Sequence, residues 1–322
     1  MMMNKIKIVI GAPTYNSIER LQSLLTSIEY YTDYNKENYK IVILDDGTPD
    51  LNKRKELAEL ALRFKVGFIQ HEKNEGIPKS WNDLTRFHDA ELVILLNDDI
   101  QIVNANWLRS FVYFMDNNPK VGSLGFAIIH IDSNTKLPDK QFTPPSEEGP
   151  PNRVGSPNGC SFGFRKELWE KIVNPDKSIG FYEDLISFYE ELNFNFEIAK
   201  MGFQAFQLVT PLLEHHGSLT FNLNQNLAIR TMGTYVSNEE YLARMKENKS
   251  LWISYEVHEQ LALKENKCFR MDYARMMFAK RWGCKDWINN PQSEVHHTLV
   301  DILPKIKIKY LDKDLNEKEC EI

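Results

Sequence analysis

The sequence predicts an α/β protein built on a mostly parallel, doubly wound sheet, followed by a mainly helical C-terminal extension. Over the first hundred residues, short β-branched runs alternate with segments whose apolar residues recur at helical spacing. This alternation is typical of an open sheet with helices on both faces. From about residue 222 the chain instead contains helical patterns, which predict the extension.

Each element of the first half has its own signal. The expected strands are KIKIVIGAP, YKIVILDDG, KVGFIQHE and ELVILLNDD, and the expected helices are NSIERLQSLLTSIEYY, LNKRKELAELALRF and PKSWNDLTRFHD. Strand, helix and strand in this order predict parallel, right-handed connections. The run ELVILL is apolar throughout, as in a central strand that is covered on both faces.

The second half is less regular. Residues 132–158 contain six prolines and no apolar periodicity, so they predict a long loop. GCSFGFRKELWEKIV predicts a strand running into a helix, and residues 180–217 predict a helix followed by a strand. EEYLARMKENKSLWISYEVHEQL and MDYARMMFAKRWG are candidate helices of the extension. The spacing of the second favours a packing helix, with stacking of its aromatic and basic residues on a sugar or nucleobase as the alternative.

The chain of 322 residues, with 42% hydrophobic and 26% charged residues, has the composition of a soluble globular enzyme. Its net charge of -6 gives no overall attraction to nucleic acid or to an anionic membrane. The four cysteines lack metal-ligand or disulfide spacing, and no apolar stretch is long enough to span a membrane. We therefore expect a cytoplasmic protein with at most peripheral membrane contact, and nothing in the sequence indicates its oligomeric state.

Three polar clusters come directly after predicted strands: Pro13 to Asn16, Asp45 to Gly47, and Asn97 to Asp99. Ligands of such sheets bind beyond the carboxyl ends of the strands, so we expect the clusters to meet in one crevice. Adjacent carboxylates in a crevice are costly unless a cation or hydrogen-bond donors compensate them. Mg²⁺ or Mn²⁺ shared with a nucleoside diphosphate would do so. The alternative interpretation is a solvated turn that caps the next helix.

Over residues 5–221, the order and spacing of APTYN, LDDG, NEGIPKSWN, NDD and EHHGSL resemble the inverting family 2 glycosyltransferases. The resemblance implies the Rossmann-like GT-A fold, with a nucleotide-binding half (1–104), an acceptor-binding half (105–221) and an extension (222–322). It implies a metal-dependent transferase of glycan biosynthesis that moves a hexosyl or pentosyl group from a nucleoside diphosphate sugar, with UDP expected. The acceptor would be a hydroxyl of a glycan, a lipid-linked glycan, a protein or a modified base.

The same resemblance assigns roles to residues around the nucleotide. Those residues are Pro13, Tyr15, Asn16, Asp45, Asp46, Asn74, Gly76, Asn82, Asn97 and Asp98. By the family pattern, Tyr15 stacks on the base, while Asp46 accepts a hydrogen bond from it with Asp45 in support. Gly76 is equally explained as a turn glycine.

NDD occupies the position of the family's metal-binding Asp-x-Asp signature, with Asn97 in place of the first aspartate. The resemblance implies that Asp98 faces the ribose or diphosphate and that Asp99 holds Mn²⁺ or Mg²⁺. In EHHGSL, His215, with His216 as second choice, would complete the metal shell or contact the diphosphate.

Two acidic pairs compete for the role of general base: Glu183-Asp184 and Glu190-Glu191. Laying GFYEDLISFYEELNF on the family pattern favours the second pair, with Glu191 as the base and Glu190 as its neighbour. Asp184 is the alternative base, and an exposed acidic helix face is the alternative for either pair.

Two other functions stay open at this point. A nucleotide-sugar-binding module that has lost catalysis would explain Asn97 and the glutamate at position 191. A nucleotidyltransferase would use a similar sheet, but it usually carries a glycine-rich basic loop after the first strand. GAPTYNSIERL contains no such loop.

Overall fold

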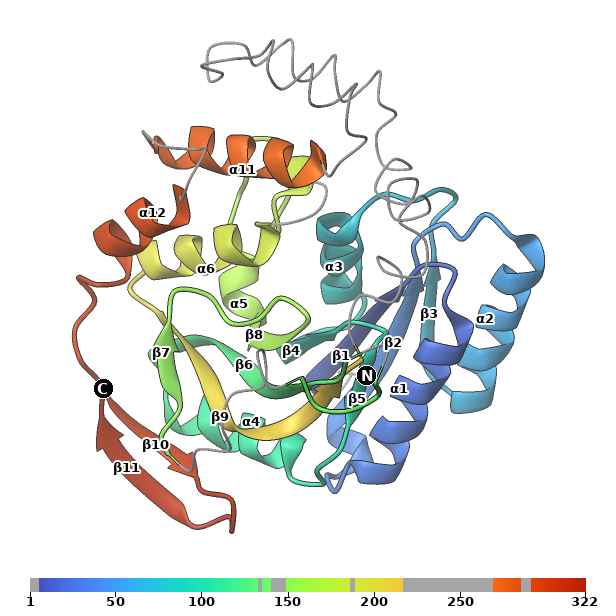
Figure 1. Cartoon of the computed structure of the whole chain (residues 1–322), viewed down its shortest axis with the longest axis horizontal. Coiled ribbons are helices and arrows are strands. Elements are labelled where there is room, and N and C mark those ends of the chain that lie inside the picture. The colour runs from blue at the N-terminus through green and yellow to red at the C-terminus, as the bar shows by residue number, and fades with distance from the viewer. Residues whose placement is uncertain (1–5, 133–134, 140–148, 186–188, 217–268, 285–290) are drawn as a thin grey trace, which may run out of the picture.

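The structure is a computed structural model that describes residues 6–132, 135–139, 149–185, 189–216, 269–284 and 291–322. Its centre is one large curled sheet (Figure 1). The strands are β1 (Ile6–Thr14), β2 (Tyr39–Asp45), β3 (Gly67–Gln70), β4 (Ala90–Leu96), β5 (Ile100–Ile102), β6 (Val121–His130), β7 (Asn152–Val154), β8 (Ser161–Arg165) and β9 (Gln204–His215). They follow the order β3-β2-β1-β4-β8-β6-β9-β5, with β7 beside β9.

Helices cover both faces of this sheet. They are α1 (Ile18–Tyr31), α2 (Leu51–Phe64), α3 (Ile77–Arg86), α4 (Trp107–Asn117), α5 (Lys166–Trp169) and α6 (Glu190–Lys200), with the short 3-10 turns η1 (Lys36–Asn38) and η2 (Glu183–Leu185). Ile8 and Ile10 of β1 pack with α1, α2 and α4, whereas the intervening Val9 packs with α3, α5 and α6. This period of two is the reason why β1 is apolar throughout. The predicted α/β class is confirmed.

The pairing of the strands decides which chain ends meet. β1 to β4 are parallel, β8 runs antiparallel to β4 and β6, and β9 is parallel to β6. Leu96 at the end of β4 therefore faces Ser161 at the start of β8. The short β5 folds back against the end of β9, so that Ile100 faces His215. The carboxyl ends of β1, β2, β4, β6 and β9 consequently share one edge with the start of β8.

The second half differs from the expected elements in two places. Part of the predicted loop 132–158 is a strand, because β7 pairs with β9, while residues 133–134 and 140–148 lie outside the described residues. The helix expected to follow residue 180 begins only at Glu190. The strand β6 was not among the expected elements.

The extension contains two described helices, α11 (Phe269–Trp282) and α12 (Pro291–Leu299). They pack against α6 at one end of the sheet, through an apolar cluster that includes Phe196, Phe278 and Val295 (Figure 1). MDYARMMFAKRWG is thus a packing helix, as predicted. The candidate EEYLARMKENKSLWISYEVHEQL lies outside the described residues.

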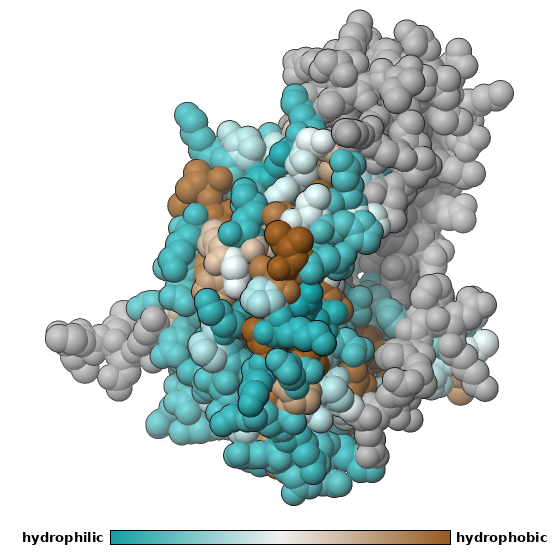
Figure 2. Space-filling view, turned by 90° about the vertical axis from the view of Figure 1, so that its left-hand side faces the viewer, coloured by the Kyte–Doolittle hydropathy of each residue, from teal (hydrophilic) through white to brown (hydrophobic). Residues whose placement is uncertain are grey.

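The charged C-terminus forms a hairpin that was not predicted. It consists of β10 (Lys307–Leu311) and β11 (Glu317–Glu321), and it packs on α4 through the fully buried Ile308. The side of the molecule that carries α12 and this hairpin is mainly hydrophilic, with small apolar areas between polar ones (Figure 2). Within the described residues, every helix is too short or too polar to cross a membrane.

Candidate active site

The predicted crevice begins where β1, β2 and β4 end. Thr14 Oγ1, at the last residue of β1, donates a 2.6 Å hydrogen bond to Asp98 Oδ2, just beyond β4. The backbone N–H of Asp46, just beyond β2, donates to the carbonyl oxygen of Thr14 at 2.9 Å. The three strand ends therefore lie side by side, as their polar clusters predicted.

The turn after β1 carries Pro13, Tyr15 and Asn16. Asn16 has φ 58°, in the left-handed region that asparagine adopts more readily than most residues. Its backbone N–H donates to Thr48 Oγ1 at 2.8 Å, which fixes the turn to the segment after β2. Tyr15 directly precedes Asn16 in this turn, and its side chain is partly exposed at this edge of the sheet.

Asp45 is fully buried, and its carboxylate is occupied within the protein. Oδ1 accepts from the backbone N–H of Thr48 at 3.0 Å, and Oδ2 accepts from Gln70 Nε2 at 2.9 Å. Asp45 therefore shapes the turn after β2, which agrees with a supporting role.

Asp46 organises the segment that leads into α3. Its carboxylate accepts hydrogen bonds from the backbone N–H groups of Glu75 at 2.8 Å and Gly76 at 3.1 Å. Gly47 has φ 75°, and a Cβ there would lie 2.0 Å from the backbone carbon of Lys73. Only glycine allows the two loops to approach this closely.

Sequence analysis did not single out His71, whose imidazole joins two carboxylates. Nδ1 lies 2.8 Å from Asp46 Oδ1, and Nε2 lies 3.1 Å from Asp83 Oδ2. Burial alone would lower its pKa, but the hydrogen bonds and charges of the two aspartates raise the pKa of His71 to about 9. The only signal in the sequence was a histidine at the end of the predicted third strand.

Asn74 and Gly76 lie beside Asp46 in the same loop. Asn74 is buried, and within the described part of the chain neither its side-chain oxygen nor its nitrogen has a hydrogen-bond partner. A buried amide without partners is costly, so this side chain is suited to a ligand. Gly76 has φ 101° and directly precedes α3, whose free N–H groups begin there.

Asn82 is committed to internal contacts. Its Oδ1 accepts from Trp169 Nε1 and from the backbone N–H of Phe181, both at 2.9 Å. Its Nδ2 donates to the Phe181 carbonyl at 2.8 Å and to Glu183 Oε1 at 2.9 Å. The structure thus makes Asn82 a fixed link between α3 and the 180–183 segment.

Asp98 and Asp99 are adjacent, but their surroundings differ. Burial and the neighbouring Asp99 carboxylate raise the pKa of Asp98 to about 7. Burial would also raise the pKa of Asp99, but His215 and Arg20 hold it below its usual range. The backbone N–H of Asn97 donates to the Cys160 carbonyl at 2.9 Å, which fixes the start of β8 to this turn.

The pairing of β5 with β9 brings His215 to Asp99. His215 Nε2 lies 3.3 Å from Asp99 Oδ1, while its Nδ1 lies 3.2 Å from Nδ1 of His130. His216 reaches Asp99 only through its backbone N–H, and its ring nitrogen lies 3.2 Å from Glu214 Oε2. His130, which was not predicted, arrives through the pairing of β6 with β9.

These residues fit a divalent metal ion. Asp99 Oδ1 is buried and lies near His215 Nε2, but it accepts no hydrogen bond from the residues that the structure describes. A carboxylate oxygen facing an imidazole nitrogen is a donor set that Mn²⁺ accepts readily, and Mg²⁺ would use the carboxylate with substrate phosphates.

Glu191 comes to the same edge from α6. Its carboxyl group lies against Gly159, where an added Cβ would be 3.0 Å from Glu191 Cδ. Residues 159 and 160 directly precede β8, next to the turn that carries Asp99. Burial raises the pKa of Glu191, and burial with the Glu191 charge raises the pKa of Glu190.

The competing pair lies on η2. Glu183 Oε1 accepts from Asn82, and the backbone N–H of Asp184 donates to Asp176 Oδ2 at 3.1 Å. These contacts tie the pair to α3 and to the 174–180 turn.

Comparisons with known proteins identify the family. The family model described as "Glycosyl transferase family 2" matches residues 9–181, more than half of the chain. A search of curated protein sequences found no match.

Solved structures of glycosyltransferases share the fold. TarS 1–349 from S. aureus is 19% identical, with TM-score 0.52. The match covers 91% of this chain and 83% of the TarS chain. The mannosyltransferase PcManGT from Pyrobaculum calidifontis, solved with GDP-Man and Mn²⁺, is 14% identical, with TM-score 0.53. The match covers 93% of this chain and 81% of the mannosyltransferase chain. GalNAc-T7, solved with UDP, GalNAc and Mn²⁺, is 14% identical, with TM-score 0.57; 94% of this chain and 58% of that chain are covered. The chain is therefore a GT-A glycosyltransferase that belongs to family 2.

Proposed function

We propose that this enzyme transfers a sugar from a nucleoside diphosphate sugar, with UDP as the preferred carrier, to a hydroxyl acceptor with inversion of configuration. Asp99 and His215 would hold Mn²⁺ or Mg²⁺. The observation that carries the proposal is the buried Oδ1 of Asp99, which lies 3.3 Å from His215 Nε2 and accepts no hydrogen bond among the described residues, at the edge where the strand ends meet.

The bound metal would stabilise the charge of the departing nucleoside diphosphate. His215 can ligate through Nε2 only if its proton is on Nδ1, where it would donate to His130 Nδ1. Burial, followed by the nearby His215, lowers the pKa of His130, which favours the neutral acceptor form. His130 would thus fix the tautomer of the ligand.

Several contacts support a nucleotide on the other side of the crevice. The carboxylate of Asp46 already interacts with His71, Glu75 and Gly76 and can only accept hydrogen bonds, so any ligand group that it contacts must be a donor, such as the ring N–H of uracil or guanine. Tyr15 is available for stacking on the base, and Asn74 has a free amide beside Asp46. Nucleotide complexes of similar folds agree with this class: TarS was solved with UDP-GlcNAc, and PcManGT with GDP-Man.

Glu191 would act as the general base. Inversion requires a carboxylate that removes the proton of the acceptor hydroxyl as the new bond forms. Its place beside Gly159, near the Asp99 turn, supports this role better than the contacts of Asp184 support the alternative.

The test is release of UDP from UDP-sugars with Mn²⁺, by wild type and by Asp99→Ala. We expect Asp99→Ala to lower turnover by ~10²-fold or more, because a preorganised charge at the leaving group is lost. The matched control is Asp33→Ala, which removes an exposed carboxylate that pairs with Arg109 and should leave turnover unchanged.

Circular dichroism and melting temperature must show that Asp99→Ala is folded. A folded Asp99→Ala variant with full turnover would refute the metal assignment. Wild type that binds UDP-sugars but never releases UDP would instead favour an inactive binding module.

A further inference from the structure

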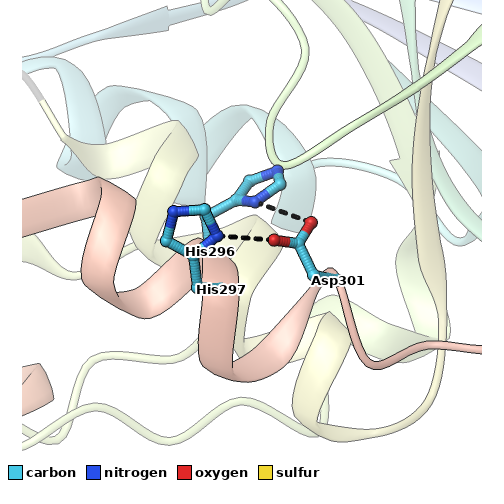
Figure 3. Close-up of side chains that lie close together, drawn as sticks. All are labelled: His296, His297 and Asp301. Carbon is cyan, nitrogen blue, oxygen red and sulfur yellow. Dashed lines mark hydrogen bonds and ion pairs between the residues drawn. The ribbon is translucent and has the colours of Figure 1, made fainter.

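The last turn of α12 carries a cluster that is separate in sequence from the Asp99 centre. His296 Nδ1 lies 3.2 Å from Asp301 Oδ1, and His297 Nδ1 lies 2.6 Å from Asp301 Oδ2. Figure 3 shows both imidazole rings turned toward the one carboxylate. Among the described residues, this is the group of three metal-ligating side chains whose donor atoms lie within 4.8 Å of one another.

The backbone brings these side chains together. The N–H groups of Val300 and Asp301 both donate to the carbonyl oxygen of His296, at 2.8 and 3.2 Å. The chain therefore curls back at the end of the helix and places Asp301 beside the two histidines. Their convergence depends on local backbone hydrogen bonds and not on long-range packing alone.

The helix end is also anchored to the rest of the molecule. Arg153, in β7, donates to the carbonyl oxygens of Val300 at 3.1 Å and Leu303 at 3.2 Å. The ring of His296 packs against Gly155, where an added Cβ would lie 2.4 Å from His296 Cδ2. A site that is held in place before binding loses less conformational entropy when a ligand arrives.

The donor atoms have the chemistry and spacing of a zinc site. Zn²⁺ binds imidazole nitrogen and carboxylate oxygen at ~2.0 to 2.2 Å in a tetrahedron, so neighbouring ligand atoms lie roughly 3.4 Å apart. The observed separations of 3.2 and 2.6 Å are shorter, so the ligand atoms need to move apart by less than about 1 Å to admit the ion. Each imidazole ligates through Nδ1 only when that nitrogen carries no proton. Mg²⁺, which prefers oxygen ligands and water, fits this set poorly.

We propose that His296, His297 and Asp301 form a second metal site, selective for Zn²⁺ over Mg²⁺, that fastens the end of α12 beside β7. The three side chains leave at least one coordination position for water. Because Val295 belongs to the apolar cluster of α6, α11 and α12, the bound ion would stabilise the helical extension and not the transfer chemistry.

The experiment is isothermal titration of the metal-free full chain with Zn²⁺ and, separately, with Mg²⁺. The Asp99 centre also contains a histidine, so the titrations are made in the Asp99→Ala background. We expect one Zn²⁺ per chain to bind there, with no comparable Mg²⁺ binding, and Zn²⁺ to raise the melting temperature.

The decisive variant is His297→Gln, because this side chain is 72% exposed and its loss should not disturb folding. We expect Zn²⁺ affinity to fall by more than ~10-fold and the gain in melting temperature to disappear. Asp301→Asn should have the same effect, whereas the control His88→Gln should have none. Equal Zn²⁺ affinity in His297→Gln, Asp301→Asn and their parent would overturn the proposal, as would equally tight Mg²⁺ binding.

Discussion

Glu190 and Glu191 are consecutive, but the fold gives them different surroundings. Glu190 is buried, and its Oε2 has no hydrogen-bond partner in the described segments, whereas Glu191 is partly exposed and lies against Gly159. Tyr189, with φ 65°, turns the chain into α6 just before them. A base must reach an acceptor from solvent, so Glu191 is the better placed of the two.

Glu191→Gln should lower turnover by ~10²-fold or more, because general base catalysis contributes about that much. Burial raises the pKa of Glu191, so the rising limb of kcat/KM against pH should lie above the usual value of 4.5. The rate increases with pH because only the ionised carboxylate accepts the proton. Steady-state kinetics across pH would test this, and the rising limb should be absent from the pH profile of Glu191→Gln.

Asp184→Asn is the matched comparison for that prediction. It should keep most of the activity, since the described contacts of Asp184 belong to η2 and the 174–180 turn. A large loss in Asp184→Asn with an active Glu191→Gln would transfer the role of base to η2.

His71 should make folding stability depend on pH. Its pKa of about 9 in the folded state exceeds the ordinary 6.5, so its contribution is complete below pH 6.5 and is lost as pH rises through 9. With the imidazole only 9% exposed, the contribution could reach about 3 kcal/mol.

Urea unfolding at several pH values would measure the contribution of His71 to the free energy of unfolding. We expect His71→Gln to be destabilised most at pH 6 and much less near pH 10, with a flatter pH profile than wild type. A constant difference between the two proteins from pH 6 to pH 10 would show that the ion pairs with Asp46 and Asp83 are not responsible.

At the scale of elements, the sequence predicted those helices and strands whose signal lies within a short run of neighbouring residues. The alternating strands and helices of the first half were found because their apolar period depends only on neighbouring residues. The meeting of the strand ends followed from these elements, because the carboxyl ends of parallel strands lie at one edge of the sheet. β6 was missed because two glycines and a serine interrupt the apolar run VGSLGFAIIH, and β7 was missed because it is only three residues long.

The same distinction applies to the site. Asp99 and His215 were predicted from their motifs, but His71 and His130 owe their positions to contacts that only the folded chain creates. In the tail, the alternation of lysine and apolar residues in KIKIKYL is a period-two signal that could have revealed β10. The charges around it concealed the strand.

The hairpin should depend on Asn118. Its Nδ2 donates to the Lys309 carbonyl at 2.7 Å, and its Oδ1 accepts from the Lys309 N–H at 2.8 Å. Asn118→Ala leaves both backbone groups without these partners, so we expect a loss of about 1 to 3 kcal/mol in the free energy of unfolding.

Denaturant unfolding would measure the loss, with Asn117→Ala as control. Asn117 is exposed and donates only within α4, to the Tyr113 carbonyl, so its removal should cost less than about 0.5 kcal/mol. Equal effects of the two substitutions would mean that the pairing with β10 contributes nothing to stability.

At the scale of the whole molecule, the proposed metal joins the two halves of the sheet. Asp99 follows β4, within the first hundred residues of the chain, whereas His215 ends β9, more than a hundred residues later. A ligand held between them binds the folded chain and not the unfolded one, so it should stabilise the molecule by mass action.

UDP with Mn²⁺, at concentrations near 100 times the dissociation constant, should stabilise the protein by about 2.7 kcal/mol. With an unfolding entropy of about 2.1 cal/mol/K per residue, this corresponds to a rise of roughly 4 °C in the melting temperature of this 322-residue chain. UDP with EDTA should give a much smaller rise, because the diphosphate then meets Asp98 and Asp99 without a cation between them. CDP with Mn²⁺ is the control for the base, since its ring nitrogen is an acceptor where Asp46 needs a donor. Equal shifts with UDP and CDP would remove Asp46 from base recognition, and equal shifts with Mn²⁺ and EDTA would remove the metal from nucleotide binding.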